Sequence, residues 1–278
     1  MSKASPVPEL VSGLISLTLR AGRVILDIYG TDFVVSQKAD ASAVTAADRD
    51  AETLILRGLA DLCPDIPVVA EEEAAEGRIP EAGDRFFLVD PLDGTKEFVS
   101  RNGEFTVNIA LIEHSVPILG VVYAPALGVL YAGAAGHGAW KAQVADDRIG
   151  PIAPIHVRKA PARLAAIGSR SHGSEEASGW LDQFPVDSFV TAGSSLKFCL
   201  VAEGHADLYP RLGRTMEWDT AAGDAVLRAA GGIVTTLDGL PLTYGRCIQE
   251  GEAPFANPHF VAYGDCDLVR SKPALAGG

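Results

Sequence analysis

The first sixty residues carry two stretches in which apolar residues recur every three or four positions. This spacing is that of one face of an α-helix, so it predicts a long first helix over about residues 10–28. A second helix is predicted to begin near Thr45 and to end at Pro64, which cannot continue a helix. The apolar positions are Leu10, Leu14, Leu17, Ala21, Val24 and Ile28 in the first stretch and Ala47, Ala51, Leu54, Ile55 and Leu62 in the second.

Short apolar runs separated by glycine and proline then replace the helical spacing. In the first half of the chain they predict closely spaced strands, which favour an antiparallel meander. In the second half, predicted strands and helices alternate, which is typical of layered α/β structure. The predicted strands are 86–90, 106–112, 118–123, 129–132, 139–141, 164–167, 188–190 and 207–209, and the later helices are 174–184 and 194–203.

The segment 149–154, with two prolines and a glycine, separates these two patterns and is the expected boundary. It is too short for a flexible linker, so the halves are expected to pack as a rigid unit. Residues 1–150 are predicted to form an α+β half with the antiparallel sheet and most candidate metal ligands. Residues 151–278 are predicted to form an α/β half that contributes Asp219 and substrate contacts. The Ala/Gly-rich C-terminal tail is expected to be disordered.

Composition narrows the class of protein. The chain has 278 residues, of which 47% are hydrophobic, enough to bury a proper core. Its net charge of -13 repels nucleic acids and anionic lipids, so no nucleic-acid partner is expected. A phosphorylated ligand must then meet positive charge from bound cations or from a few placed Lys and Arg side chains.

Location and redox state follow from the same composition. The N-terminus lacks the apolar run of a signal peptide, and no stretch reaches the ~18 apolar residues of a membrane span, so no integral membrane segment is expected. We expect a cytoplasmic protein, or one attached peripherally to the inner face of the cell membrane. The four cysteines, Cys63, Cys199, Cys247 and Cys266, are far apart and are predicted to be reduced core residues.

The stretch 86–98 is the richest in candidate chemistry. An apolar strand delivers Asp90 at its end, and Pro91 is predicted to make the chain leave the sheet, so that Asp93 folds back toward Asp90. Two neighbouring carboxylates repel each other unless cations lie between them, which favours Mg²⁺ with oxygen ligands. The backbone carbonyl of Leu92 is a further candidate ligand.

The next two residues add a candidate phosphate site. Gly94 allows backbone amides to approach an anion closely, and Thr95 supplies a hydroxyl at the start of a short helical turn. The alternative for Asp93-Gly94 is an ordinary turn after a strand, which is a common structure.

Glu71, Glu72 and Glu73 follow the apolar run 66–70, so Glu71 is predicted to lie at a strand end as Asp90 does. Side chains at neighbouring strand ends can meet. A solvated acidic loop is the alternative, and it is the expected structure for Glu73 and Glu76.

Two further acids begin predicted helices. Asp219 in the sequence 218–224 is either an ordinary N-cap or a metal ligand held at a helix start. Thr45 and Asp48 resemble a capping box. Asp48 is expected to have a catalytic role only if the fold brings it beside Thr95, where it could orient the Thr95 hydroxyl toward a water.

Together these motifs resemble the signatures of the inositol monophosphatase superfamily over nearly the whole chain. The segments 93–98, 102–108, 193–199 and 206–211 resemble, within that superfamily, the CysQ group of bacterial 3'(2'),5'-bisphosphate nucleotidases. Inositol phosphatases usually have Thr-Asn where this chain has Lys96-Glu97. Ala43 and Ala70 depart from the group's usual proline and its usual serine or glycine.

The resemblance implies a layered αβαβα sandwich of the α+β or α/β class, the sugar phosphatase fold. It implies two to three Mg²⁺ ions, with Glu71, Asp90, the Leu92 carbonyl, Asp93 and Asp219 as ligands. It also implies an attacking water oriented by Glu71, Thr95 and Asp48. The implied substrate site consists of Glu71, Leu92, Asp93, Gly94, Thr95, Lys197 and Asp219.

The resemblance further implies a small phosphorylated nucleotide, adenosine 3',5'-bisphosphate from sulfate activation, which is cleaved to AMP and phosphate. Its second phosphate would need basic partners, and Lys96, Lys197, Arg170 and Arg211 are candidates that can equally be surface charges. An inositol or sugar monophosphatase is the enzymatic alternative, and a non-catalytic metal and nucleotide sensor is the other. Both a monomer and a homodimer are compatible with the sequence.

Overall fold

The computed structural model describes residues 8–37, 43–169, 175–246 and 252–270. Two helices open it, α1 (Glu9–Tyr29) and α2 (Ala46–Leu62), with the short strands β1 (Ser36–Gln37) and β2 (Ala43–Val44) between them. Both helices were predicted. The N-cap residue Thr45 accepts a hydrogen bond from the Ala47 amide, and Asp48 accepts one from the Thr45 amide, which forms the predicted capping box.

A large sheet follows, in the order β10-β8-β7-β6-β5-β4-β3, with β9 paired to β8. Strands β4 to β8 form the predicted antiparallel meander, while β3 runs parallel to β4. The elements of this part are β3 (Val68–Ala70), α3 (Glu71–Ala75), β4 (Arg85–Asp93), α4 (Thr95–Val99), β5 (Thr106–Glu113), β6 (Val116–Ala124), η1 (Pro125–Leu127), β7 (Val129–Ala134), β8 (Gly138–Ala145), β9 (Arg148–Ile149) and β10 (Ala153–Ile155).

A smaller sheet has the order β12-β11-β13-β15-β14 and mixes parallel and antiparallel pairs. Strands β11, β12 and β13 were predicted, whereas β14 and β15 were missed. The elements are β11 (Leu164–Ser169), α5 (Glu175–Leu181), β12 (Val186–Ala192), α6 (Leu196–Ala202), β13 (Leu208–Arg211), α7 (Glu217–Ala229), β14 (Ile233–Thr236), β15 (Phe260–Tyr263) and α8 (Asp267–Arg270). Residue 174, predicted to begin a helix, lies outside the described residues.

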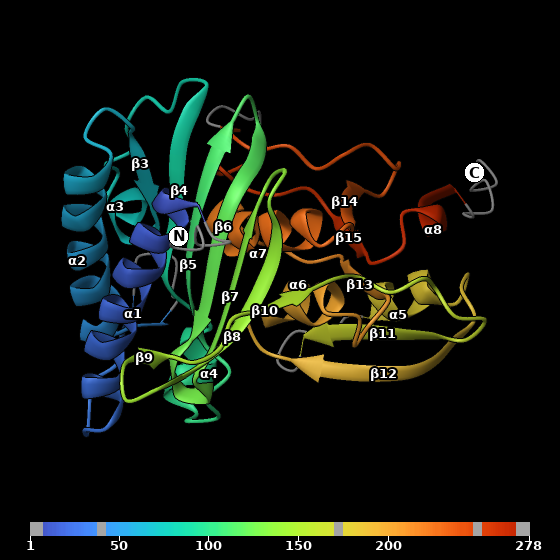
Figure 1. Ribbon diagram of the computed structural model, residues 1–278, viewed down its shortest axis with the longest axis horizontal. Coiled ribbons are helices and arrows are strands. Elements are labelled where there is room, and N and C mark those ends of the chain that lie inside the picture. The colour runs from blue at the N-terminus through green and yellow to red at the C-terminus, as the bar shows by residue number, and fades with distance from the viewer. Residues whose placement is uncertain (1–7, 38–42, 170–174, 247–251, 271–278) are drawn as a thin grey trace, which may run out of the picture.

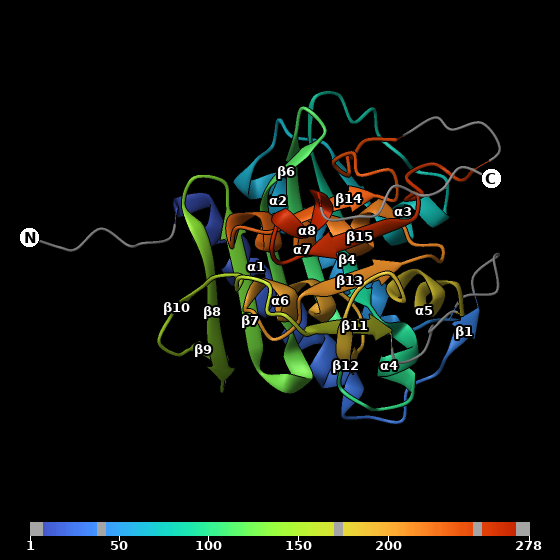
Figure 2. The same ribbon diagram turned by 90° about the vertical axis from the view of Figure 1, so that its right-hand side faces the viewer.

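The elements stack in five layers, as the αβαβα prediction requires. From left to right, Figure 1 shows α2 and α1, the large sheet, α7 and α6, and then the small sheet with α5 and α8. In Figure 2 the small sheet, α5 and α8 lie in front of the large sheet, and α1 and α2 lie behind it. Strand β10 belongs to the large sheet although it lies beyond residue 150. The division into halves at that residue stays a prediction.

Both faces of the large sheet are buried, which explains its nearly continuous apolar strands. Along β4, Phe87 and Val89 pack into the cluster that includes α1 and α2, while Phe86 and Leu88 pack into the cluster that includes α6 and α7. Side chains alternate along a strand, so Asp90 continues on the α7 side.

Helix α7 lies unusually close to the sheet because β6 and β7 carry glycine beneath it. A Cβ atom on Gly120 would lie 2.4 Å from the Ala222 carbonyl oxygen, and one on Gly133 would lie 2.7 Å from the Val226 Cα. These glycines therefore set the distance between α7, which carries Asp219, and the strands that carry the other acids.

Two sequence expectations need correction. Pro91 does not take the chain out of the sheet, because β4 continues to Asp93 after an irregularity in its pairing with β5. Cys266 is exposed rather than in the core, whereas Cys199 is buried and Cys63 is half-buried. These three are free thiols, and Cys247 lies outside the described residues, as does the C-terminal tail from residue 271. Among the described residues, no helix has the length and apolar character needed to cross a membrane.

Replacing Gly120 by alanine is expected to destabilise the protein by about 1–3 kcal/mol or more, because the added methyl group has no space under α7. Gly179 is the matched control: it lies in α5 with nothing within 4 Å of an added Cβ. Gly179→Ala should stabilise the protein by up to about 1 kcal/mol. Urea denaturation of both variants measures the difference. Equal stability of the two variants would contradict the close approach of α7.

Candidate active site

A cavity of about 430 Å³ brings together most of the residues that the sequence singled out. They come from the start of α3, the end of β4, the start of α4, α6 and the first turn of α7. The predicted site residues that line the cavity are Glu71, Asp90, Leu92, Asp93, Gly94, Thr95, Lys197 and Asp219. Asp48 contributes through its contact with Thr95.

Glu71 and Asp90 meet because β3 and β4 are parallel neighbours. Ala70 pairs with Val89, so the next residue of each strand is an acid. Glu71 is also the first residue of α3, so Glu73 lies in a short helix and not in the predicted solvated loop, whereas Glu76 lies exposed just after the helix, as predicted. Glu73 and Glu76, assigned to that loop, pair with Arg78.

A bulge in β4 places Asp93 on the same face of the sheet as Asp90. Asp90 pairs with Asn108 and Asp93 pairs with Thr106, so an advance of three residues along β4 matches an advance of two residues along β5. Since successive side chains alternate, a spacing of three would otherwise send the two acids to opposite faces. The bulge turns both toward α7.

Ser195 connects Asp93 to the helix that carries Asp219. The Ser195 hydroxyl lies 3.0 Å from Asp93 Oδ2 and 2.6 Å from the Asp219 carbonyl oxygen, and it accepts a 3.0 Å hydrogen bond from Asn108 Nδ2. Both Ser195 and Asn108 are buried. Both lie in the motifs 102–108 and 193–199, but no role was predicted for either, since their partners are far along the chain.

Asp219 is the third residue of α7, and Met216 is its N-cap, so the N-cap assignment for Asp219 is wrong. Its Oδ2 instead accepts a 2.8 Å hydrogen bond from the Met216 amide. Burial raises the Asp219 pKa well above its usual range, and the negative charges of Asp93 and Glu71 raise it further. The pKa of Asp93 is also raised, chiefly by burial, while the positive charge of Lys197 opposes the shift.

Asp48 has both properties that the sequence left open. Its Oδ2 accepts hydrogen bonds of 2.7 Å from the Thr45 amide and from the Thr45 hydroxyl. Its Oδ1 lies 3.3 Å from the Thr95 hydroxyl, which donates to it. Gly94, just before Thr95, has a φ of 92°, a backbone conformation that favours glycine.

Basic side chains also line the cavity. Lys197 is buried, donates a 2.5 Å hydrogen bond to the Ser194 carbonyl oxygen and lies 5.4 Å from the centre of the Tyr209 ring. Burial lowers the pKa of Lys197 to about 8. Lys96 and Arg211 also line the cavity, whereas Arg170 lies outside the described residues.

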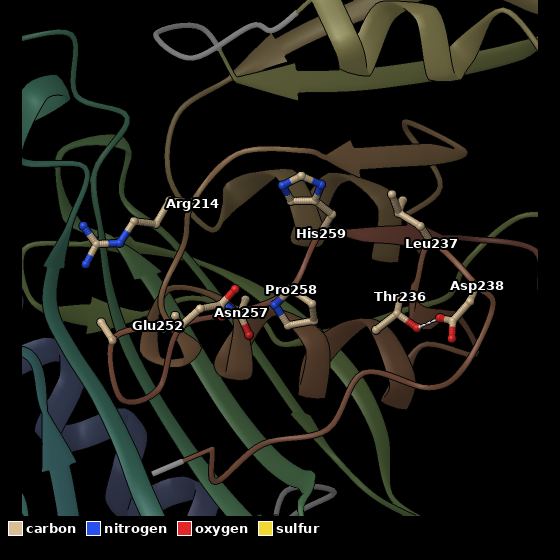
Figure 3. A pocket seen from close by; sticks show the side chains of 10 residues that line it. Arg214, Thr236, Leu237, Asp238, Glu252, Asn257, Pro258 and His259 are labelled. Atoms are coloured by element: carbon tan, nitrogen blue, oxygen red, sulfur yellow. Dashed lines mark hydrogen bonds between the residues drawn. The ribbon is translucent and has the colours of Figure 1, made fainter. Parts of the chain in front are cut away.

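A second cavity of about 840 Å³ shares Arg214 with the first (Figure 3). On its wall Asn257 donates through Nδ2 to the Met216 carbonyl oxygen at 2.7 Å and to the hydroxyls of Thr215 and Thr220 at 3.2 and 3.1 Å. Asn257 therefore fixes the chain on both sides of Asp219.

The donor set fits a hard divalent cation in its chemistry. The Glu71, Asp90, Asp93 and Asp219 carboxylates and the Leu92 carbonyl are all oxygen donors, the ligand type of Mg²⁺. In the part of the chain that the structure describes, no three Asp, Glu, His or Cys side chains are already gathered to hold a metal ion. Asp90 and Asp219 instead accept hydrogen bonds from the Leu92 and Met216 amides.

Comparison with known proteins gives consistent matches over most of the chain. The profile of the inositol monophosphatase family matches residues 8–260. The 3'(2'),5'-bisphosphate nucleotidase CysQ of Escherichia coli K12 is 49% identical over 246 residues, which are 88% of this chain and 95% of that protein.

Two solved structures show the same fold. The crystal structure of CysQ from Bacteroides thetaiotaomicron has a TM-score of 0.75 and 37% identity, and the match covers 92% of this chain and 97% of that one. An inositol monophosphatase from Anabaena has a TM-score of 0.71 and 25% identity, with 96% and 97% covered.

Asp219→Asn is expected to raise the stability of the metal-free protein, because it removes a buried negative charge beside Asp93 and Glu71. Folding raises the Asp219 pKa above its ordinary value of 3.8. The wild type therefore loses stability as the pH rises above 3.8, and the variant lacks this loss. Melting curves in EDTA at pH 5 and pH 8 test this, with an expected shift of roughly 2–4 °C at the higher pH.

Added Mg²⁺ should raise the melting temperature of the wild type and leave that of Asp219→Asn nearly unchanged, since a ligand that binds only the folded state stabilises it. Asp61→Asn, on the exposed surface of α2, is the control and should respond as the wild type does. A full Mg²⁺ response in Asp219→Asn would remove Asp219 from the ligand set.

Proposed function

The chain belongs to the inositol monophosphatase family, and from that premise we propose that it hydrolyses the 3'-phosphate of adenosine 3',5'-bisphosphate to AMP and phosphate. It is then a phosphoric monoester hydrolase, a 3'(2'),5'-bisphosphate nucleotidase that removes a by-product of sulfate activation. The observation that carries the proposal is the cavity that four carboxylates line together with Thr95 and Lys197. The names of relatives such as E. coli CysQ support the choice of substrate.

Enzymes of this family are generally metal-dependent, and we propose two to three Mg²⁺ ions held by Glu71, Asp90, the Leu92 carbonyl, Asp93 and Asp219. The ions, when bound, would lower the pKa of a water and stabilise charge on the leaving oxygen. All the side chains in the proposed ligand set are carboxylates, and they already repel one another. The substrate phosphate is also an anion, which explains why a cation is needed for it to bind in this cavity.

Thr95 and Asp48 would orient the attacking water. The Thr95 hydroxyl donates a hydrogen bond to Asp48 Oδ1, which leaves the lone pairs of the Thr95 oxygen to accept a hydrogen bond from water. Asp48 would then accept the proton that the water loses through Thr95. The new P–O bond forms as the bond to the 3'-oxygen breaks, and that oxygen takes up a proton on leaving.

The reacting phosphate would also contact the turn from Asp93 to Thr95, where Gly94 lets the backbone approach closely. For the second phosphate, at the 5' position, we propose Lys197 and Arg211, and Lys96 lines the same cavity. Lys197 is the best placed, because its hydrogen bonds to backbone carbonyls fix its position. The cytoplasmic location and the oligomeric state stay predictions.

A substrate panel tests the activity. Phosphate release with Mg²⁺ should be at least ~10-fold more efficient for adenosine 3',5'-bisphosphate than for inositol 1-phosphate or fructose 1,6-bisphosphate, a difference of about 1.4 kcal/mol in transition-state binding. Faster turnover of inositol 1-phosphate would instead support an inositol monophosphatase. Metal and nucleotide binding without turnover would support the sensor.

Lys197→Met tests recognition of the second phosphate. The variant keeps the volume but removes the charge, so kcat/KM for adenosine 3',5'-bisphosphate should fall by about 10- to 100-fold, as expected for loss of a hydrogen bond between charged groups. The value for 3'-AMP, which lacks the 5'-phosphate, should change much less. Lys159→Met, at an exposed ion pair with Asp265 and Asp267, is the control and should leave both substrates unaffected. Equal losses on the two substrates would contradict the assignment.

A further inference from the structure

Helix α3, which begins with Glu71, is capped from another helix. Both oxygens of the Glu52 carboxylate, on α2, accept backbone hydrogen bonds: Oε2 from the Glu72 amide at 2.7 Å and Oε1 from the Glu73 amide at 2.9 Å. These amides lie in the first turn of α3, where no carbonyl within the helix can accept them. The N-cap residue, Ala70, has no side chain that can do so.

This contact determines where Glu71 points. Strand β3 ends at Ala70 and α3 begins at the next residue, so no loop lies between them. The pairing of β3 with β4 fixes the backbone before Glu71, and Glu52 fixes the backbone directly after it. The direction of the Glu71 side chain into the cavity thus depends on a residue that does not line the cavity.

Capping a short helix with a buried carboxylate costs free energy. Glu52 is only 3% exposed, and burial, followed by the nearby charges of Glu72 and Glu71, raises its pKa to about 7. A serine at position 70 could cap the same turn without burying a second acid behind Glu71. Stability alone therefore does not explain a glutamate at position 52.

Glu52 and Asp48 lie four residues apart on α2, so they share one face of that helix. Asp48 contacts Thr95 and Glu52 holds α3, which means that one rigid helix positions residues on both sides of the proposed water site. We propose that Glu52 is a positioning residue that orients Glu71 for metal binding and keeps it in register with the Asp48–Thr95 pair. The inference rests on the proposed function, but metal binding tests it separately.

The first experiment uses Mn²⁺ alone as the probe. Calorimetric titration of the full-length Glu52→Gln protein should show Mn²⁺ affinity lowered by about tenfold or more, the usual effect of losing a residue that orients a metal ligand. Because Arg78 pairs at the surface with the side chains of Glu73 and Glu76, whereas the Glu52 carboxylate accepts hydrogen bonds from backbone amides, Arg78→Gln is the matched control. It should bind Mn²⁺ as the wild type does. Wild-type affinity in Glu52→Gln, or an equal loss in Arg78→Gln, would overturn the proposal.

Kinetics and rescue separate positioning from folding. In Glu52→Gln, kcat for adenosine 3',5'-bisphosphate should fall and recover in part at high Mg²⁺, while KM for the nucleotide stays within about twofold. Adding Ala70→Ser, which supplies an N-cap hydroxyl, should restore Mn²⁺ affinity, and this double variant also serves if Glu52→Gln folds poorly. Failure of the rescue in a folded double variant would contradict the capping role. An inactive wild type that still binds Mn²⁺ would instead refute only the proposed function.

Discussion

Repulsion between buried carboxylates is the constraint on which the rest of the site depends. Burial and mutual charge raise the pKa values of Asp93 and Asp219, so the fold must hold these groups together against their own electrostatics. The compensation is local: Ser195 and the Lys197 charge act on Asp93, and the Met216 amide acts on Asp219. This repulsion is the physical reason for proposing cations at the site.

Elements on both faces of the large sheet hold these acids close together. On one face α2 contacts Thr95 and α3 through two acids, and on the other α7 presents Asp219 from above β6 and β7. The β4 bulge lies between the two helices and turns Asp90 and Asp93 toward the same side. Helices and strands therefore set the position of nearly every acid, and the β4 bulge and the short turn at Gly94 are the irregular features.

The sequence predicted those features that depend on local pattern. Strand ends located Glu71 and Asp90, and apolar spacing located α1 and α2, because these signals lie within a few residues of one another. The bulge was not predictable, since it depends on the register of β4 against β5. Nor were the contacts of Ser195, Asn108 and Glu52, whose partners lie 102, 87 and 20 residues away in sequence.

The close packing of α7 against β6 and β7 also has a consequence for biosynthesis. Glu71, Asp90 and Asp93 leave the ribosome long before α7 has been made. Until then, α7 does not cover the apolar sheet face that carries Gly120 and Gly133. Three acids without the fourth make an incomplete site. The proposed metal site is therefore complete only once α7 has docked.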